Sequence, residues 1–448
     1  MADVGSAFFT TMVLTIILNL MGVGGKEFVR LCYFTNWSNT RESPYARFQI
    51  SDIDPSLCTH LVYAFAKIDS DSHTIAPMYG DEEPRPGQTG RYKEFNDLKR
   101  RNPRLRTLLS IGGQVAGDVF TQVTRDDNRL SRFATTTVDF LRKRGFDGLD
   151  VDWEYPNATY KADFSKLLKT LRTTFEEEDT RRDRLLLTAA LAAGTQHFGG
   201  YDFGALARYL DYANLMTYDY HNAGWSDITG FNSPLYSRKS DPRFNAELST
   251  NWTMQYYISR GVPKAKILVG VTGAGSYFKL ANENETDVGA PAIKIYPETR
   301  KSAMWLLDDR LAYPEICRVL QNTQVKRVFD EEQHVPYAYI NDDWYGYEDK
   351  QSLEGKVSWM AKEGVGGVMF WSLDQDDFAG KLCDDGKYPL LRALGGTIKG
   401  HMGPHLTDNV NPDIVYLTKY MGGGAARPVM SAVVNVVMTV LVVVFGLH

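Results

Sequence analysis

The sequence is short of the residues and charges on which several classes of protein depend. It has only 4 cysteines in 448 residues, and no two are spaced as CxxC, so the usual cysteine zinc site is excluded. Lys and Arg total 50 against 55 Asp and Glu, which leaves no basic excess to bind nucleic acid. No GxGxxG motif follows an apolar run, which argues against a dinucleotide-binding fold. We therefore expect no metal ion, no cofactor and no nucleic-acid partner.

What is present is the composition of a globular protein rich in aromatic residues. A hydrophobic fraction of 43% excludes wholesale disorder. The 8 Trp, 25 Tyr and 22 Phe would mostly fill cores, but such abundance also suits a protein that stacks flat ligands. At ~150 residues per domain, the length suits two or three domains, or one large barrel with additions.

Both ends of the chain are apolar. Residues 4–25 carry no charge and end in small residues, which predicts a secretory signal over residues 1–25; a buried first helix or an uncleaved anchor is the alternative. Residues 428–447 also lack charged side chains and, at about 20 residues, are long enough to span a bilayer. Small residues at 422–426 precede them, as in a GPI signal, with a transmembrane anchor as the alternative. We expect an extracellular protein held at the plasma membrane by the tail 428–448.

The cysteines and glycosylation sequons agree with a secreted protein. Four cysteines allow three pairings, and the simplest pairs Cys32 with Cys58 and Cys317 with Cys383. Four sequons are candidates for N-glycosylation: Asn36, Asn157, Asn251 and Asn284.

Eight short apolar runs alternate with helical patterns along the chain. The runs are nearly continuous, as expected of strands that are buried on both faces. Amphipathic patterns between them predict helices over residues 128–144, 161–177, 201–210 and 248–260. The alternation predicts a parallel (β/α)8 TIM barrel, with a doubly wound open sheet as the alternative. The eight runs cover residues 29–35, 60–66, 106–113, 146–155, 185–193, 212–220, 266–273 and 366–374.

One connection is too long to be a simple loop. About 90 residues separate the seventh and eighth runs, and a loop of that length needs structure of its own. We therefore expect a small α+β insertion subdomain over residues 275–347, with the barrel formed by residues 26–274 and 348–395. Residues 396–427 are expected to form an irregular, partly extended stalk before the tail.

The strongest chemical signal is the run DGLDVDWEYP at residues 147–156. In a strand, alternate residues share a face, so Asp150, Asp152 and Glu154 point one way and the large apolar residues between them point the other. If the apolar set packs on the helices, the acids point into the barrel, where burial and like charge raise the pKa of at least one. Glu154 falls at the carboxyl end of the strand, where barrel active sites open. A protonated acid there beside other carboxylates is typical of glycoside hydrolysis.

At this point the residues resemble a known family. DGLDVDWEYP is similar to the signature of glycoside hydrolase family 18, the chitinases, and three further motifs are similar to its third, sixth and eighth strands. The segments LCYFTNW, LVYAFA, TGFNSPLY and VPYAYINDDWYGYEDKQSL also resemble the animal chitinase pattern. The resemblance runs from about residue 29 to residue 394. The three strand motifs are SIGG at 110–113, MTYDY at 216–220 and GGVMFWSLDQDDF at 366–378.

The resemblance implies a mechanism in which the substrate supplies the nucleophile. Glu154 would protonate the glycosidic oxygen while the 2-acetamido carbonyl of the substrate attacks the anomeric carbon, giving an oxazolinium. Asp152 would hold the acetamido N–H and stabilise the developing positive charge, and Asp150 would share a proton with Asp152. Tyr218 would donate a hydrogen bond to the acetamido carbonyl.

The resemblance also implies a set of substrate-binding residues. Asp219 would support the reacting sugar, and Trp371 would form the aromatic floor beneath it. The other implied positions in the cleft are Tyr33, Phe65, Gly112, Gly113, Gln114, Tyr155, Met216 and Trp225.

Three departures from the family pattern lie in the same region. Gln114 stands where the family usually has Trp, and Ala274 and Ser276 replace a Tyr and an Arg that usually line the cleft. The chemistry should survive these changes, but binding of long chains should be weaker.

The sequence therefore predicts a monomeric, endo-acting chitinase that acts on chitin and chito-oligosaccharides with retention of configuration. The alternatives are a chitinase-like lectin, whose kind typically lacks the Glu found here, and an endo-β-N-acetylglucosaminidase that uses the same acids.

Overall fold

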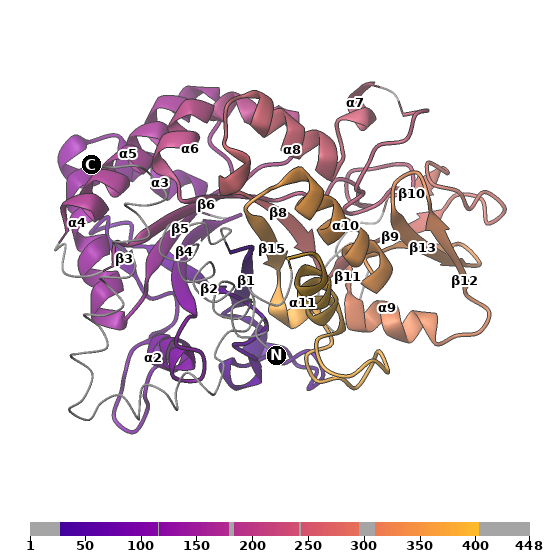
Figure 1. Cartoon of the computed structure of the whole chain (residues 1–448), viewed down its shortest axis with the longest axis horizontal. Helices are drawn as coiled ribbons and strands as arrows, with labels where there is room; N and C mark the ends of the chain where they lie inside the picture. The colour runs from indigo at the N-terminus through magenta and orange to yellow at the C-terminus, as the bar shows by residue number, and fades with distance from the viewer. Residues whose placement is uncertain (1–26, 115, 179–182, 242, 295–309, 403–448) are drawn as a thin grey trace, which may run out of the picture. The chain divides into compact units, whose positions relative to one another are not determined.

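The computed structural model describes residues 27–114, 116–178, 183–241, 243–294 and 310–402, and its centre is a closed barrel (Figure 1). Eight parallel strands follow one another around it, and pairing between β1 and β2 closes the ring. The (β/α)8 prediction is confirmed, since each predicted apolar run coincides with one strand of the barrel, β2 extending two residues beyond its run. The strands are β1 (Val29–Thr35), β2 (His60–Ile68), β4 (Arg106–Gly113), β5 (Gly148–Trp153), β6 (Leu186–Leu191), β7 (Tyr212–Leu215), β8 (Ile267–Thr272) and β15 (Gly367–Trp371).

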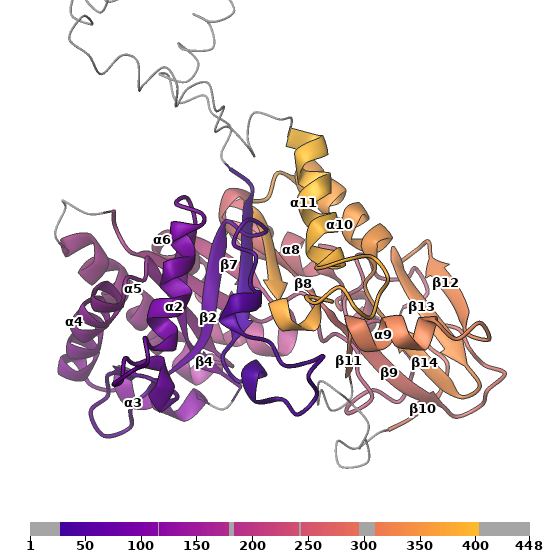
Figure 2. The ribbon, with the colours of Figure 1, turned by 90° about the horizontal axis from the view of Figure 1, so that it is seen from below.

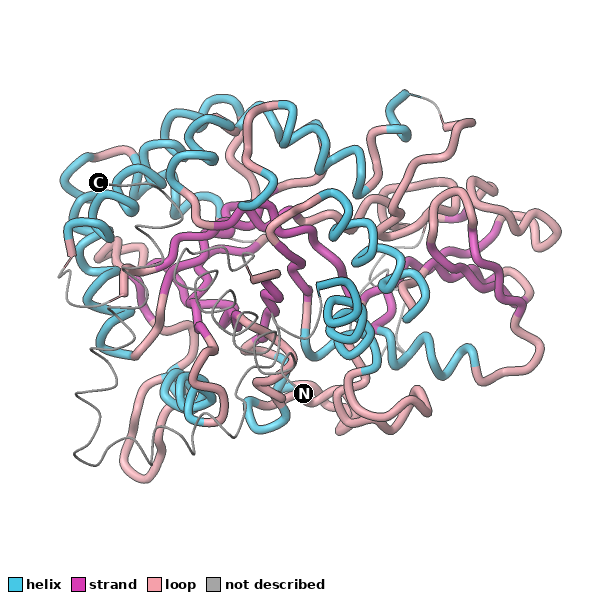
Figure 3. Tube along the Cα trace, in the orientation of Figure 1, coloured by secondary structure: helices cyan, strands magenta, loops and turns pink. Residues whose placement is uncertain are grey.

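Helices cover the outside of the barrel, as the ring of helices around the strands in Figure 3 shows. Helix α4 (Asp127–Arg144) and helix α5 (Lys161–Glu177) match their predicted ranges, and α4 is closed by an Asp126 N-cap and by Gly145 with φ of 81°. The other helices are α2 (Arg91–Asp97), α3 (Gly117–Thr124), α6 (Phe203–Tyr209), α7 (Arg243–Ala246), α8 (Thr250–Ser259), α10 (Lys350–Glu363) and α11 (Pro389–Met402). A two-residue strand, β3 (Ile75–Ala76), pairs antiparallel with β2.

The long connection between β8 and β15 folds into a second, antiparallel sheet, which lies beside the barrel in Figures 1 and 2. Its own core packs Phe278, Tyr337 and Trp344 against one another, so the insertion has an apolar centre separate from that of the barrel. The elements are β9 (Ala274–Leu280), β10 (Ala292–Ile293), β11 (Arg310–Ala312), α9 (Tyr313–Leu320), β12 (Lys326–Asp330), β13 (Val335–Ile340) and β14 (Asp343–Gly346).

Two disulfides cross-link the described chain, one within the barrel and one between the insertion and the barrel. Cys32 in β1 is bonded to Cys58 before β2, and Cys317 in α9 is bonded to Cys383 in the loop that follows β15. The second bond links the insertion to the barrel across 66 residues of sequence. Each bond limits the unfolded chain and contributes about 2–4 kcal/mol to stability.

The expected stalk does not begin at residue 396, which is a correction to the sequence prediction. Helix α11 continues through Met402, because Leu394 and Ile398, one helical turn apart, are both buried against the body of the protein. The predicted signal over residues 1–25 and the predicted tail over residues 428–448 lie outside the described residues. Within the ranges that the structure describes, no helix is both long enough and apolar enough to cross a bilayer.

Candidate active site

Strand β5 places its acidic residues inside the barrel. Trp153 points outward, where its ring stacks on Phe120 at 5.0 Å between centroids and packs edge-on against Phe164 in α5. Asp150 and Asp152, of opposite parity, face inward and are 0% and 3% exposed. The alternation expected from the sequence is therefore present in the structure.

Asp150 is fixed at the centre of the barrel by four other strands' side chains. Its Oδ2 accepts from Tyr33 Oη at 2.9 Å and Ser110 Oγ at 2.7 Å, and its Oδ1 accepts from Thr188 Oγ1 at 2.6 Å and Asn214 Nδ2 at 3.1 Å. These bonds lower the pKa of Asp150, but burial outweighs them and the pKa lies above its usual value. Both carboxylate oxygens accept hydrogen bonds, so Asp150 is held in one position beneath Asp152.

Asp152 sits one layer higher and has unused bonding capacity. Its Oδ1 is buried and makes no hydrogen bond within the described part of the chain. Burial, then the charges of Glu154 and Asp150, raise the pKa of Asp152 well above its usual range. An unsatisfied buried carboxyl oxygen that faces a cleft is suited to accept a hydrogen bond from a ligand N–H or O–H.

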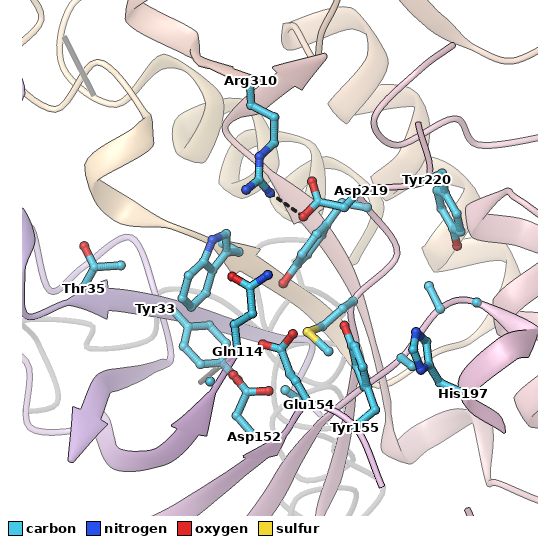
Figure 4. A pocket seen from close by; sticks show the side chains of 18 of the residues that line it. Tyr33, Thr35, Gln114, Asp152, Glu154, Tyr155, His197, Asp219, Tyr220 and Arg310 are labelled. Atoms are coloured by element: carbon cyan, nitrogen blue, oxygen red, sulfur yellow. Dashed lines mark hydrogen bonds and ion pairs between the residues drawn. The ribbon is translucent and has the colours of Figure 1, made fainter. Parts of the chain in front are cut away.

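Glu154 follows at the carboxyl end of β5, half-buried at the bottom of the cleft (Figure 4). Burial and the charge of Asp219 raise its pKa, whereas a hydrogen bond with Tyr155 and the charge of Arg310 lower it; burial prevails. A carboxyl group with a raised pKa remains protonated closer to neutral pH, which is what a general acid requires.

Aromatic rings form one wall of the same cleft. Trp371, at the end of β15, lies with its centroid 5.2 Å from Tyr33 and 6.2 Å from Phe65, and Phe65 stacks on Trp37 at 5.9 Å. On another part of the wall, Trp225 is 46% exposed. Flat apolar rings of this kind match the apolar faces of sugar rings.

These groups surround a cleft of about 610 Å³. All but two of the predicted catalytic and substrate-binding residues line it; the exceptions are Asp150, which lies beneath it, and Gly112. The lining residues that were predicted are Tyr33, Phe65, Gly113, Gln114, Asp152, Glu154, Tyr155, Met216, Tyr218, Asp219, Trp225 and Trp371.

Gly112 corrects a sequence prediction, because it does not line the cleft. Its φ is 119°, and a Cβ at this position would come within 1.9 Å of the carbonyl oxygen of Asp152. Glycine is needed there so that β4 can approach the backbone of β5 at Asp152 closely.

The structure shows where Ala274 and Ser276 lie, and their expected effect on the binding of long chains stays a prediction. Ala274 is 4% exposed and pairs with Ala312, while Ser276 is fully buried and donates its hydroxyl to the carbonyl of His221 at 2.6 Å. Neither residue lines the cleft. The cation at this wall is Arg310, which sequence reasoning missed.

Among the other lining residues that were not predicted are His197 and Trp37. The ring of His197, in the turn after β6, stacks on Tyr155 with centroids 4.0 Å apart, and Trp37 lies in the LCYFTNW motif without being singled out. Trp37 could have been predicted, because it is an aromatic residue in a motif that resembles the family pattern. Nothing in the sequence around His197 indicates a site.

Burial removes one candidate for glycosylation. Asn36 is 1% exposed, and its Nδ2 donates to the carbonyl of Phe65 at 2.9 Å and to Glu82 at 2.6 Å. A glycan on Nδ2 would break both bonds and find no space, so this prediction is wrong for the folded protein. Asn157 and Asn284 are exposed and Asn251 is partly exposed, and their glycosylation stays a prediction.

A parallel barrel with ionisable carboxyl groups and an aromatic wall at the carboxyl ends of its strands has the architecture of a carbohydrate-binding TIM-barrel protein of the glycosidase type. The chain belongs to glycosyl hydrolases family 18, whose family model matches residues 29–376. This confirms the resemblance seen in the sequence.

Individual relatives include both enzymes and proteins named as chitinase-like. The chain is 38% identical over 389 residues to human chitinase-3-like protein 2, with 85% of this chain and 95% of the relative covered. It is 35% identical to mouse chitotriosidase-1, with 85% and 80% covered. A solved structure of human YKL-39, described as a pseudo-chitinase with retained chitooligosaccharide binding properties, matches with a TM-score of 0.76 at 36% identity, covering 83% of this chain and 99% of that one.

Proposed function

We propose that this protein is an endo-acting chitinase that hydrolyses β-1,4 bonds between N-acetylglucosamine units with retention of configuration. The observation that carries the proposal is the pair formed by Glu154 and Asp152: an acid with a raised pKa in the cleft, beside a buried carboxyl group with an unused oxygen. The first group suits proton donation, and the second suits an acetamido N–H.

The chemical steps follow from this pair. Glu154 donates its proton to the glycosidic oxygen, which leaves with the electrons of the broken C–O bond. The acetamido oxygen of the substrate bonds to the anomeric carbon and forms an oxazolinium, whose N–H is held by Asp152. Water then attacks the same carbon as Glu154 takes a proton from the water; the bond from this carbon to the acetamido oxygen breaks, the acetamido group is restored, and two inversions give net retention. The hydroxyl of Tyr218 is proposed to orient the acetamido carbonyl, and Trp371 is proposed to carry the sugar.

The electrostatics support a shared proton in this site. Burial raises the pKa of both Asp152 and Glu154, and the charge of Glu154 raises the pKa of Asp152 further. Both oxygens of Asp150 accept hydrogen bonds, from Tyr33, Ser110, Thr188 and Asn214. For Asp150 to share a proton with Asp152, as proposed, one of these four bonds must be replaced by a bond to Asp152.

One assay separates this proposal from its alternatives. Purified protein is incubated with chitohexaose and, separately, with a high-mannose N-glycopeptide, and new reducing ends are measured together with binding of chitohexaose by calorimetry. We expect β-configured products from chitohexaose and none from the glycopeptide. Binding without any products would establish a lectin, as for the pseudo-chitinase relative, and products from the glycopeptide alone would establish an endo-β-N-acetylglucosaminidase.

Replacing Gln114 with tryptophan is expected to strengthen binding of long oligomers only. Gln114 is exposed at the rim of the cleft, and an added ring there would stack on a sugar distant from Glu154, with a gain of about 1 kcal/mol, or roughly fivefold in KM. KM for the hexamer should fall while kcat and the KM for the trimer stay the same, because the gain is uniform binding. Gln324→Trp, on an exposed loop of the insertion, is the control; an equal effect on trimer and hexamer would place Gln114 beside the reacting sugar instead.

The two disulfides support an extracellular location, since such bonds persist in oxidising compartments. Attachment to the membrane depends on residues 428–448 and remains a prediction from the sequence. Release of active protein from intact cells by phosphatidylinositol-specific phospholipase C would establish a lipid anchor.

A further inference from the structure

The insertion sheet contributes a charged residue to the cleft that the family motifs do not indicate. We propose that Arg310, from β11, is a positioning residue for substrate: it holds Asp219 in its cleft-facing conformation and supplies the cation of this wall in place of the residue at position 276. The inference rests on the proposed function for its substrate, chito-oligosaccharide, but its geometry is independent of turnover.

Asp219 is held from two sides. Arg310 Nη1 lies 2.5 Å from Asp219 Oδ2, an ion pair drawn as a dashed line in Figure 4. On the other side, Asn232 Nδ2 donates to Asp219 Oδ1 at 2.8 Å, and the Asp219 N–H donates to Asn232 Oδ1 at 3.2 Å. Both charged side chains of the ion pair line the cleft.

The backbone of Asp219 indicates that this arrangement serves geometry rather than stability. Its φ is 60°, in the left-handed region that residues other than glycine seldom adopt. The side chains of Arg310 and Asp219 are 31% and 39% exposed, and an ion pair so open to solvent adds little to folding stability. What the pair does fix is the direction in which the Asp219 carboxylate points.

The register of the sheet explains how Arg310 reaches this place. Strand β11 runs antiparallel to β9, and Arg310 lies directly opposite Ser276. Residues opposite one another in such a pair project from the same face, with Cβ atoms about 4.5–5.5 Å apart. Ser276 is small and buried, so the long side chain on β11 extends over it toward the cleft. A guanidinium at position 310 of β11 or at position 276 of β9 would therefore reach the same wall of the cleft.

The charge of Arg310 also affects the pKa of Glu154. The titratable groups that face Glu154 are Asp152, Tyr155, Tyr218, Asp219 and Arg310. Asp219 raises the pKa of Glu154 and Arg310 lowers it. Loss of the guanidinium leaves the Asp219 charge uncompensated, which raises the pKa of Glu154 further. The protonated acid then persists to higher pH, and the alkaline limb of kcat/KM moves upward.

The test exchanges the cation between the two strands. Arg310→Ala, Arg310→Lys and the double variant Ser276→Arg/Arg310→Ala are compared with Lys326→Ala, which removes an exposed cation from β12 of the same sheet. The pH profile of kcat/KM is measured on chitotetraose, and affinity for chitotetraose is measured by calorimetry in a Glu154→Gln background.

We expect Arg310→Ala to lower kcat/KM and affinity by about tenfold, as for a lost charged hydrogen bond, and to move the alkaline limb upward. Arg310→Lys should lose less, the double variant should restore both properties, and Lys326→Ala should change neither. Unchanged kinetics and affinity in Arg310→Ala would overturn the proposal. So would equal losses in the Ala and Lys variants with an unmoved limb, because that is the mark of a merely structural role.

The calorimetric arm distinguishes this inference from the proposed function. If the wild-type protein binds chitotetraose without cleaving it, the proposed function fails. A tenfold loss of affinity on removal of Arg310 would then still support the positioning role, and unchanged affinity would overturn it.

Discussion

Glu154→Gln is expected to reduce hydrolysis of chito-oligosaccharides by about 10²–10⁴-fold, the usual scale for loss of a general acid. The amide has the shape of the acid but cannot protonate the leaving oxygen at any accessible pH. The fold should be unchanged, because Glu154 is half-buried at the cleft and the amide has the same size as the acid. The measurements are kcat on chitohexaose, near-ultraviolet circular dichroism and the affinity for chitohexaose, which should stay close to the wild-type value.

Glu94→Gln is the matched control, since Glu94 is an exposed glutamate on α2 outside the cleft, and the change is the same replacement of a carboxyl group by an amide. Its kcat should equal that of the wild type. If Glu154→Gln turned over chitohexaose at a comparable rate, Glu154 would not be the acid, and the mechanism would need another proton donor in the cleft.

Removal of the acetamido group from the substrate is expected to abolish cleavage. In the proposed reaction this group is the nucleophile, and the unsatisfied Oδ1 of Asp152 is the group that would hold its N–H. Fully deacetylated chitosan should therefore give no new reducing ends under conditions in which chitin oligomers are digested. A thiazoline that mimics the oxazolinium should inhibit, because ligands that resemble the transition state bind more tightly than substrate.

Partly acetylated chitosan provides the internal control for solubility and chain length. Its products should carry an acetylated unit at every new reducing end, which mass spectrometry of the fragments can establish. Cleavage of fully deacetylated chitosan or of cellulose at similar rates would rule out substrate assistance and would require a protein nucleophile.

The barrel was predictable because its strands are buried on both faces. Each strand leaves a nearly unbroken apolar run, and α4 and α5 have long amphipathic patterns with clear ends. The end of β7 was not predictable in the same way. The apolar run continues to Tyr220, but the strand stops at Leu215, because Thr217 turns its hydroxyl to the Gly270 carbonyl and Asp219 adopts a positive φ.

The acids of the site were predictable for a local reason, and Arg310 was not. Asp150, Asp152 and Glu154 lie within five residues, so the period of one strand suffices to place them together. Arg310 meets Asp219 across 91 residues of sequence, and their contact depends on the register of β9 against β11. No pattern in a single sequence specifies such a register. Gly112 was predicted to line the cleft because a sequence does not distinguish a glycine that allows two strands to approach closely from a glycine that lines a binding site.

The hydrogen bonds of Asp150 make the geometry of the site depend on strands that are distant in sequence. Its four partners come from β1, β4, β6 and β7, and the bond to Tyr33 joins residues 117 apart in sequence. Such distant contacts form slowly, because the intervening chain must first lose its freedom. A partly closed barrel that lacks β1 or β7 would hold the whole DGLDVDWEYP segment yet leave Asp150 without one of its four hydrogen-bond donors. The complete set of hydrogen bonds to Asp150 therefore forms only when all four of these strands have packed around β5.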